Sequence, residues 1–435
     1  MTGRCGPAGT RPGPQAARFV LALAAAALAW FAGEYGVTPA RDALAGAALL
    51  LLPIDVLPAV LVLTVRNGDA AVGALCPSDV AALVYLARLT LSMRVLSLRV
   101  TPSRVALSMF LLWAAVVTVG GYGVLTALGR VAVYAAVGVG VTHRPQGKAC
   151  LFAEVVGLSL VEIAFYLPHV PARLYGVVVN DPTHAGGLFL AALLVVAVWR
   201  GPAPVRAVLA AVLLFGIAMT YTRVVWFATA AAGAAALLPR RWYVPLLLPP
   251  AAGGLRLPLV PWVTSLFGLN RRSGDLRMRS ISAGWQLFVE RPLSGHGWAF
   301  ATAARRSGLA GADGTPVYNL WVYIGVCAGV VGVLLFLAFA ALLAREAAAR
   351  DRVAYLFLTA SLAMGLTEAY LYGVSLLAAL FFTMTSARPA ASAGGQRTGD
   401  VSVIPAGVAT DAADGSLASG TPASVAGTHA KGRLP

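Results

Sequence analysis

Long apolar blocks separated by short polar connections run through most of the chain. The blocks are about 15 to 25 residues long, which suits the roughly 20-residue helix that crosses a hydrocarbon core. They lack the strict alternation of a membrane β-barrel strand. The pattern predicts an all-α, polytopic transmembrane helical bundle of about twelve spans, near residues 17–33, 43–65, 105–120, 123–142, 150–168, 185–199, 206–221, 223–238, 243–262, 319–343, 353–369 and 371–386.

One further block, 79–98, contains Arg88 and Arg94. An unpaired arginine at the bilayer centre costs about 3 kcal/mol even on insertion scales, so we expect this block to lie along the cytoplasmic surface. The arginines of the short connections then fall on the cytoplasmic side, as the positive-inside rule requires. This interpretation divides the chain into a cytoplasmic N-terminus, a first group of spans, an external periplasmic loop, a second group of spans and a cytoplasmic tail: 1–16, 17–262, 263–318, 319–386 and 387–435.

The composition agrees with a membrane protein, because 59% of the 435 residues are hydrophobic and only 11% are charged. The net charge of +16 would suggest a nucleic-acid partner in a soluble protein. Here the arginines cluster between apolar blocks, where they fix orientation, so we expect membrane lipids and no nucleic acid as partners. The four cysteines have no paired spacing, which argues against a metal site or a disulfide framework. Residues 387–435 are small, polar and free of aromatic side chains, which predicts disorder.

The expected external loop, 263–318, is unusual for its side of the membrane. It holds seven arginines against three acidic residues. One interpretation is that a long loop is exported regardless of its charge. The other is that the loop forms part of an external site for an anion.

Within the loop, the stretch "RMRSISAGWQLFVERP" predicts an amphipathic helix that ends at Pro292. Arg279 lies on its polar face. Such a helix would lie at the membrane surface with its tryptophan in the interface, although an ordinary surface helix has the same periodicity. The apolar face comprises Ile281, Trp285, Phe288 and Val289.

Arg223, in "TYTRVVW", stands between two almost purely apolar stretches. The span count assigns it to the same side of the membrane as the loop 263–318. An arginine at the end of a span often extends its head group to the water interface. Alternatively, it is an anion ligand, because a guanidinium binds phosphate oxygens bidentately and stays charged at any pH.

Several motifs occur in an order that resembles one family. A polar motif enters one span ("NDPTHAGGLFLAALL"), Thr-Arg opens a later one ("YTRVVW"), and the large loop contains Arg, then Trp, then Pro-Leu-x-Gly-x-Gly. The span after the loop is aromatic and rich in glycine ("YNLWVYIGVCAGVVGVLLFL"). From about residue 175 to 343 the chain resembles the superfamily of O-antigen ligases and O-antigen polymerases, which are integral membrane glycosyltransferases.

The resemblance implies transfer of a glycan from an undecaprenyl diphosphate carrier to an acceptor lipid or glycan, at the outer face of the cytoplasmic (inner) membrane. It implies no metal and no cofactor. Arg223 matches the family's Ser/Thr-Arg arginine, and Arg279 or Arg277 matches its loop arginine. These side chains would bind the diphosphate and stabilise the charge that develops on the leaving group. Arg291, in the same loop, is a further candidate substrate ligand.

One position departs from the family. Where the family has His-Asn at the start of the span after the loop, this chain has Tyr318-Asn319. Either Tyr318 supplies a hydrogen bond to the substrate, or His296 in "SGHGW" serves as the general base, or the activity is altered or absent. Asp181 and His184, at an external span entrance, are candidate contacts to the acceptor or the carrier.

Ligase and polymerase activity are both compatible with these motifs. A transporter or flippase would instead carry charges along a path through the membrane midplane, and a non-catalytic partner of a polysaccharide export system is a further alternative. Ionisable residues inside spans are functional candidates by default, or they pair with an arginine of another span. The expected spans contain Asp55, Glu154, Glu162 and Glu368.

Overall fold

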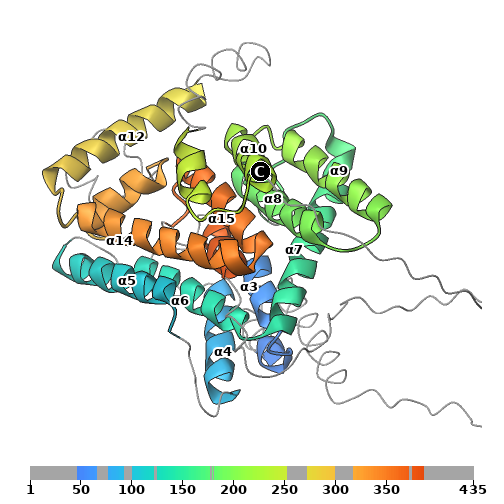
Figure 1. The fold of residues 1–435 in the computed structure, drawn as a ribbon, viewed down its shortest axis with the longest axis horizontal. Helices are drawn as coiled ribbons and strands as arrows, with labels where there is room; N and C mark the ends of the chain where they lie inside the picture. Colours follow the sequence, from blue (N-terminus) through green and yellow to red (C-terminus); the bar gives the residue numbers. More distant parts are fainter. Residues whose placement is uncertain are drawn as a thin grey trace, which may run out of the picture. The chain divides into compact units, whose positions relative to one another are not determined.

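A computed structural model describes residues 47–65, 77–92, 100–121, 125–176, 179, 181–251, 272–298, 317–371 and 375–386. All regular structure within these ranges is helical, which confirms the all-α class (Figure 1). The expected N-terminus 1–16, the first span 17–33 and the tail 387–435 lie outside the described residues.

The helices follow one another along the chain with short connections. They are α3 (Leu57–Thr64), α4 (Pro77–Ser92), α5 (Pro102–Gly120), α6 (Leu125–Thr142), α7 (Pro145–Tyr166), the 3-10 helix η1 (Leu167–His169), α8 (Pro182–Val198), α9 (Ala203–Met219), α10 (Arg223–Leu237), α12 (Arg272–Glu290), α14 (Leu320–Arg350), α15 (Arg352–Gly365) and α16 (Leu376–Thr385).

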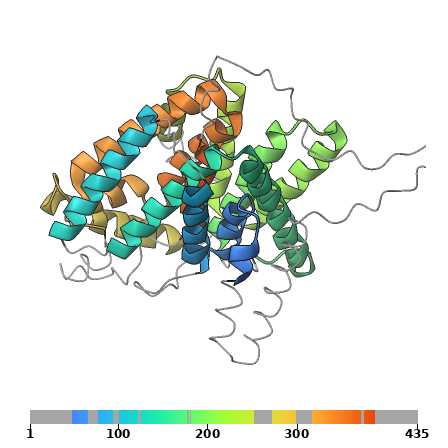
Figure 2. The ribbon, with the colours of Figure 1, turned by 90° about the horizontal axis from the view of Figure 1, so that it is seen from below.

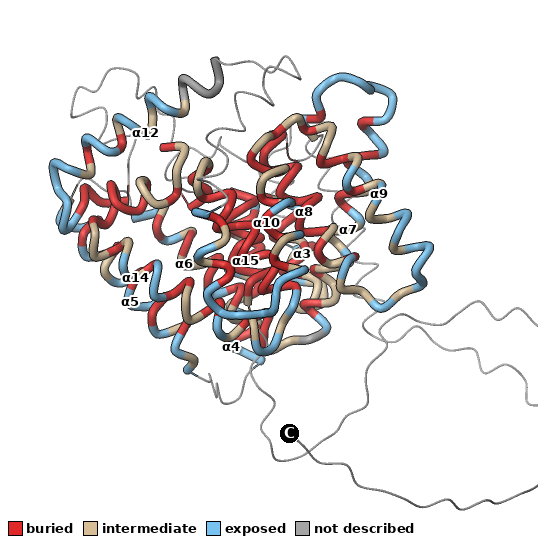
Figure 3. The backbone as a smooth tube through the Cα atoms, turned by 45° about the horizontal axis from the view of Figure 1, so that its top comes forward, coloured by how far each residue is buried: buried red, intermediate tan, exposed pale blue. Residues whose placement is uncertain are grey.

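Four helical stretches are long and apolar enough to cross a membrane: Pro102–Gly120, Leu125–Thr142, Gln146–His169 and Leu320–Arg350. The remaining apolar helices, which include α8, α9 and α10, have 10 to 17 residues. The helices α8, α15 and α16 are buried along almost their whole length, at the centre of the bundle (Figure 3). The structure therefore supports a membrane protein, and the number of twelve spans stays a prediction.

Side-chain caps explain where several helices begin. Asp181, Asn319, Asp351 and Ser375 are the N-cap residues of α8, α14, α15 and α16. Each accepts hydrogen bonds from backbone N–H groups of the first turn, which have no partner within the helix. Two of these caps, Asp181 and Asn319, are residues that the sequence marks as substrate ligands.

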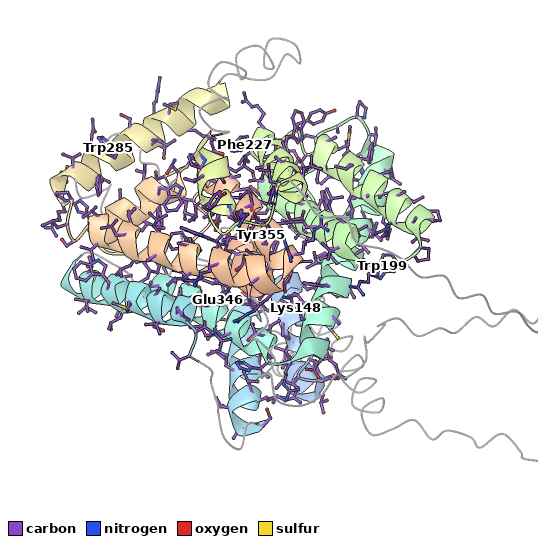
Figure 4. The ribbon with its side chains drawn as sticks, viewed as in Figure 1. Lys148, Trp199, Phe227, Trp285, Glu346 and Tyr355 are labelled. Carbon is purple, nitrogen blue, oxygen red and sulfur yellow. The ribbon has the colours of Figure 1, made fainter. Side chains whose placement is uncertain are left out.

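Polar contacts between helix termini define two ends of the bundle. At one end Lys148 pairs with Asp351 and donates to the Ser386 carbonyl at 3.0 Å. At the other end the Asn319 amide donates to the Leu366 carbonyl at 2.9 Å. We call these the Lys148 end and the Arg223 end, after a residue at each; Lys148 is labelled in Figure 4.

The helix α4 does not lie across the Lys148 end, as the sequence predicts for 79–98. Near the first turns of α4 and α6, Asp79 and Arg130 form an ion pair at 3.0 Å. At the other end of α4, Arg144 donates to Ser92 at 3.4 Å. The helix therefore runs alongside α6, and Arg88 pays no penalty as an isolated charge because it donates to the carbonyls of the segment 50–52.

The expected span 43–65 is not a single helix either. Residues 47–51 are helical, the chain turns at 52–56, and α3 begins at Leu57. Pro53 explains the interruption, because it removes a backbone donor and clashes with the preceding turn. These two differences change the span count, so the assignment of the two ends to the two sides of the membrane stays a prediction.

The amphipathic helix of the loop is present as α12, and it ends at Glu290, directly before Arg291-Pro292. It packs on the first part of α14 (Figures 1 and 2). Phe288 faces Gly325 of α14, whereas Trp285 and Val289 are 56% and 58% exposed. The predicted apolar face is therefore split between a packed half and an exposed half; Figure 4 labels Trp285.

The helix α14 is interrupted at Gly329, which has φ 66° and ψ −170°. Residues 292–298 dock against this interruption. The backbone N–H groups of His296 and Gly297 donate to the carbonyls of Val326 and Cys327 at 2.7 and 2.9 Å. Hydrogen bonds from a docked segment are how non-helical backbone becomes tolerable inside a membrane protein.

The glycines of "PLSGHG" allow this docking. A Cβ at Gly295 would lie 2.6 Å from the Ala328 nitrogen, and one at Gly329 would lie 2.1 Å from the Leu293 oxygen. Gly295 and Gly297 have φ of 73° and 94°, a region that favours glycine. The Pro-Leu-x-Gly-x-Gly motif therefore has a structural explanation in this chain.

Candidate functional site

Arg277 lies between an acidic and an aromatic side chain at the Arg223 end. Its Nη2 is 3.8 Å from Glu368 Oε2, and its Cζ is 5.1 Å from the centroid of the Tyr318 ring. The three residues come from α12, from the turn after α15 and from the start of α14. The Arg277 side chain is 27% exposed, whereas that of Glu368 is only 7% exposed. The arginine therefore stays accessible while its counter-ion is buried.

A second and a third arginine lie near the first. The charges of Arg277 and Arg173 both act on the guanidinium of Arg223. Three positive charges converge, although Arg173, Arg223 and Arg277 belong to segments far apart in the sequence. Like charges repel at close range, and a bound anion with several negative oxygens would remove that repulsion.

Arg173 also fixes the turn that leads into α10. Its Nε donates to the Thr220 carbonyl at 2.9 Å, and its Nη2 lies 3.4 Å from the Thr222 hydroxyl. Thr222 is the N-cap residue of α10, so Arg223 is the first helical residue. Tyr221 has φ 49°, which is uncommon for a residue other than glycine. The turn thus presents Arg223 at the N-terminus of a helix, where the dipole also favours anions.

Asp181 and His184 form a hydrogen-bonded relay. Asp181 Oδ1 is 2.8 Å from His184 Nδ1, and His184 Nε2 is 3.2 Å from the Ser375 hydroxyl. Burial alone would raise the pKa of Asp181, but hydrogen bonds from the His184 side chain and from two backbone N–H groups hold the pKa below its usual value. Ser375 is fully buried, so it holds the imidazole and is not itself an accessible nucleophile.

Tyr318 and Asn319, in place of the family's His-Asn, have different tasks. Burial and the negative charge of Glu368 raise the pKa of Tyr318, so its hydroxyl is protonated at neutral pH. Asn319 caps α14 and bonds the end of α15, which engages both its amide oxygen and its nitrogen. Tyr318 therefore faces the arginine cluster, whereas the contacts of Asn319 are those of a structural residue.

The structure brings some predicted site residues together and leaves others apart. Arg279 is exposed and is two residues from Arg277, which turns it about 200° around the helix axis. Arg291 is exposed at the end of α12. His296 is buried, with its Nε2 2.8 Å from the Leu287 carbonyl and 3.8 Å from the Glu290 carboxylate. These contacts fix α12 to the docked segment and do not join His296 to the arginine cluster.

Two members of the cluster were not singled out as site residues from the sequence. Arg173 lies in a connection, with no motif around it. Glu368 is visible in the sequence only as an ionisable residue at the edge of an expected span. Neither the ion pair with Arg277 nor the bonds of Arg173 to the Thr220–Thr222 turn follow from local spacing, because the partners are about 90 and 50 residues away.

The arrangement combines cations that can hold an anion with a buried carboxylate that can accept a proton. Within the described ranges there is no group of three His, Cys, Asp or Glu side chains that could hold a metal ion. Searches of protein-family models and of curated protein sequences find no match to this chain. The chemistry of the cluster therefore has to be argued from its own residues.

Proposed function

We propose that this protein is an integral membrane glycosyltransferase of the O-antigen ligase type. It moves a glycan from an undecaprenyl diphosphate carrier to an acceptor lipid or glycan at the outer face of the cytoplasmic membrane. The convergence of Arg223 and Arg277 carries the proposal. These are the two arginines that the family resemblance assigns to the diphosphate, with Arg277 as its loop arginine, and they approach one another from segments about 54 residues apart.

The neighbouring groups suit the same chemistry. A pyrophosphate leaving group carries several negative oxygens, and fixed guanidinium groups stabilise the charge that develops on it. Arg173 adds a third positive charge and holds the turn of Arg223. Tyr318, with its protonated hydroxyl and its ring under Arg277, occupies the position of the family histidine.

A polymerase of the same superfamily would use the same donor and differs only in its acceptor. A transport role is the alternative from another class, and the interruption of α14 at Gly329 is the observation in its favour, since broken helices are typical of transporter sites. Against it, the interruption is filled by the docked segment 292–298.

The test is transfer in proteoliposomes, with lipid-linked glycan extracted from cells as the donor. We expect the wild type to transfer, and Arg223→Ala to lose about 100-fold or more of the rate. Arg223→Lys keeps the charge but loses the bidentate fork, so we expect it to lose most of the rate too. A folded Arg223→Ala protein with undiminished transfer would overturn the proposal, as would a wild type that only moves the donor across the membrane.

A further inference from the structure

Glu368 is the buried ionisable group that the proposed site leaves without a role. Its side chain is only 7% exposed. Among the described residues no hydrogen-bond donor reaches its carboxylate; the closest cation, Arg277, stands 3.8 Å away. A buried carboxylate normally accepts several hydrogen bonds, because desolvation without them is costly. The missing donors indicate a ligand that brings a hydroxyl group.

The other candidate bases near the cluster are already engaged. His184 uses both ring nitrogens, with Asp181 at 2.8 Å and Ser375 at 3.2 Å. His296 directs Nε2 to the Leu287 carbonyl, away from the arginines. The Tyr318 hydroxyl is protonated at neutral pH and is therefore a donor. Glu368 alone among these five groups combines a negative charge with unfilled acceptor positions.

Electrostatics places Glu368 where both reactants meet. It is paired with Arg277, the arginine that would bind the diphosphate, and the charges of His184 and Asp181 also act on it. A carboxylate beside the leaving-group site, close to but not filled by the arginine, can receive a proton while the diphosphate departs.

We propose that Glu368 is the general base that deprotonates the acceptor hydroxyl, taking the task that the missing histidine would have; this assignment rests on the proposed glycosyltransferase function. The acceptor oxygen attacks the anomeric carbon of the donor sugar and forms the new glycosidic bond. The bond from that carbon to the diphosphate oxygen breaks, and its electron pair leaves with the diphosphate, which Arg223 and Arg277 stabilise. The acceptor's proton moves to the Glu368 carboxylate.

The first variant for testing is Glu368→Gln, which keeps the shape and removes the basicity. We expect it to bind undecaprenyl diphosphate as the wild type does, within about 3-fold, and to lose 100-fold or more of transfer. The pH profile of the wild type should fall on the acid side as the base becomes protonated. This limb should be absent from the residual activity of Glu368→Gln, a change that a merely structural role would not produce.

A nucleophile that needs no deprotonation gives an independent test. Azide should restore transfer to Glu368→Ala and yield the glycosyl azide, while the hydroxyl acceptor stays unreacted. Asp181→Asn serves as the control, because azide should not raise its rate. Loss of diphosphate binding and thermal stability in Glu368→Gln, in parallel with transfer, would overturn the assignment, as would unchanged transfer. A wild type that neither binds nor transfers the carrier-linked donor would refute the proposed function itself.

Discussion

The guanidinium of Arg277 lies over the ring of Tyr318, with 5.1 Å between Cζ and the ring centroid. The ring face carries partial negative charge and so orients the cation without neutralising it. The carboxylate of Glu368 approaches the same guanidinium at 3.8 Å. The residue that replaces the family histidine thus acts on an arginine of the proposed diphosphate site.

The ring of Tyr318 should matter more than its hydroxyl. Tyr318→Phe keeps the face under Arg277, so we expect transfer within about 3-fold of the wild type. Tyr318→Ala removes the cation–π contact, which is worth about 0.5 to 2 kcal/mol, and should lower transfer by about 2- to 30-fold. Initial rates in proteoliposomes distinguish these results. Equal losses in both variants would assign the effect to the hydroxyl.

Acidification should weaken the fold through Asp181, the N-cap of α8. Because its folded pKa is below the usual value of 3.8, ionised Asp181 stabilises the protein above that pH, and the contribution is lost as the pH falls through the folded pKa. Asp181→Asn should therefore lower the Tm at pH 7, with the difference shrinking below pH 3.8. Thermal unfolding in detergent measures this. A difference that is the same at pH 7 and pH 3 would contradict it.

The interruption of α14 should tolerate no side chain. Gly329→Ala would bring Cβ to 2.1 Å from the Leu293 oxygen, at a φ and ψ that only glycine adopts readily, so we expect a loss of about 3 kcal/mol or more. Gly233, in α10, has open space around its Cβ direction and is the matched control. Gly233→Ala should leave the Tm unchanged or raise it slightly. Similar Tm values for the two variants would refute this view of the motif.

His296 should stabilise the fold and not take part in the reaction. Its buried Nε2 bonds the Leu287 carbonyl, and a glutamine can retain a donor there. We expect His296→Gln to lower the Tm by several degrees while the folded protein transfers within about 3-fold of the wild-type rate. Transfer normalised to folded protein, measured by size-exclusion chromatography, is the relevant quantity. A 100-fold loss with an unchanged Tm would make His296 a catalytic residue.

The sequence predicts local structure well where local rules decide it. The helix that ends before Pro292 is an example, since helical periodicity and a proline stop are both local signals. The separation of its apolar residues into packed Phe288 and exposed Trp285 depends on α14 and is invisible to periodicity. In the same way, Arg88 in α4 looks prohibitive for a membrane helix until its carbonyl partners around residues 50–52 are known.

The site could be predicted only in part for the same physical reason. The resemblance marks Arg223 directly, but it leaves Arg277 and Arg279 equivalent, because both fit the motif. Only the rotation of α12 against α14 decides which of the two approaches Arg223. Arg173 and Glu368 join the cluster through contacts across the fold, and no spacing along the chain encodes them.

Two arginines on one helix allow the most direct test of the central claim, that Arg223 and Arg277 form a diphosphate site. The measurement is the Kd of undecaprenyl diphosphate for the purified protein and for Arg277→Ala and Arg279→Ala. We predict that Arg277→Ala weakens binding by about 10-fold or more, as expected for charge-assisted hydrogen bonds, while Arg279→Ala stays within about 2-fold. Equal Kd values for the two variants, or wild-type affinity in Arg277→Ala, would contradict the account.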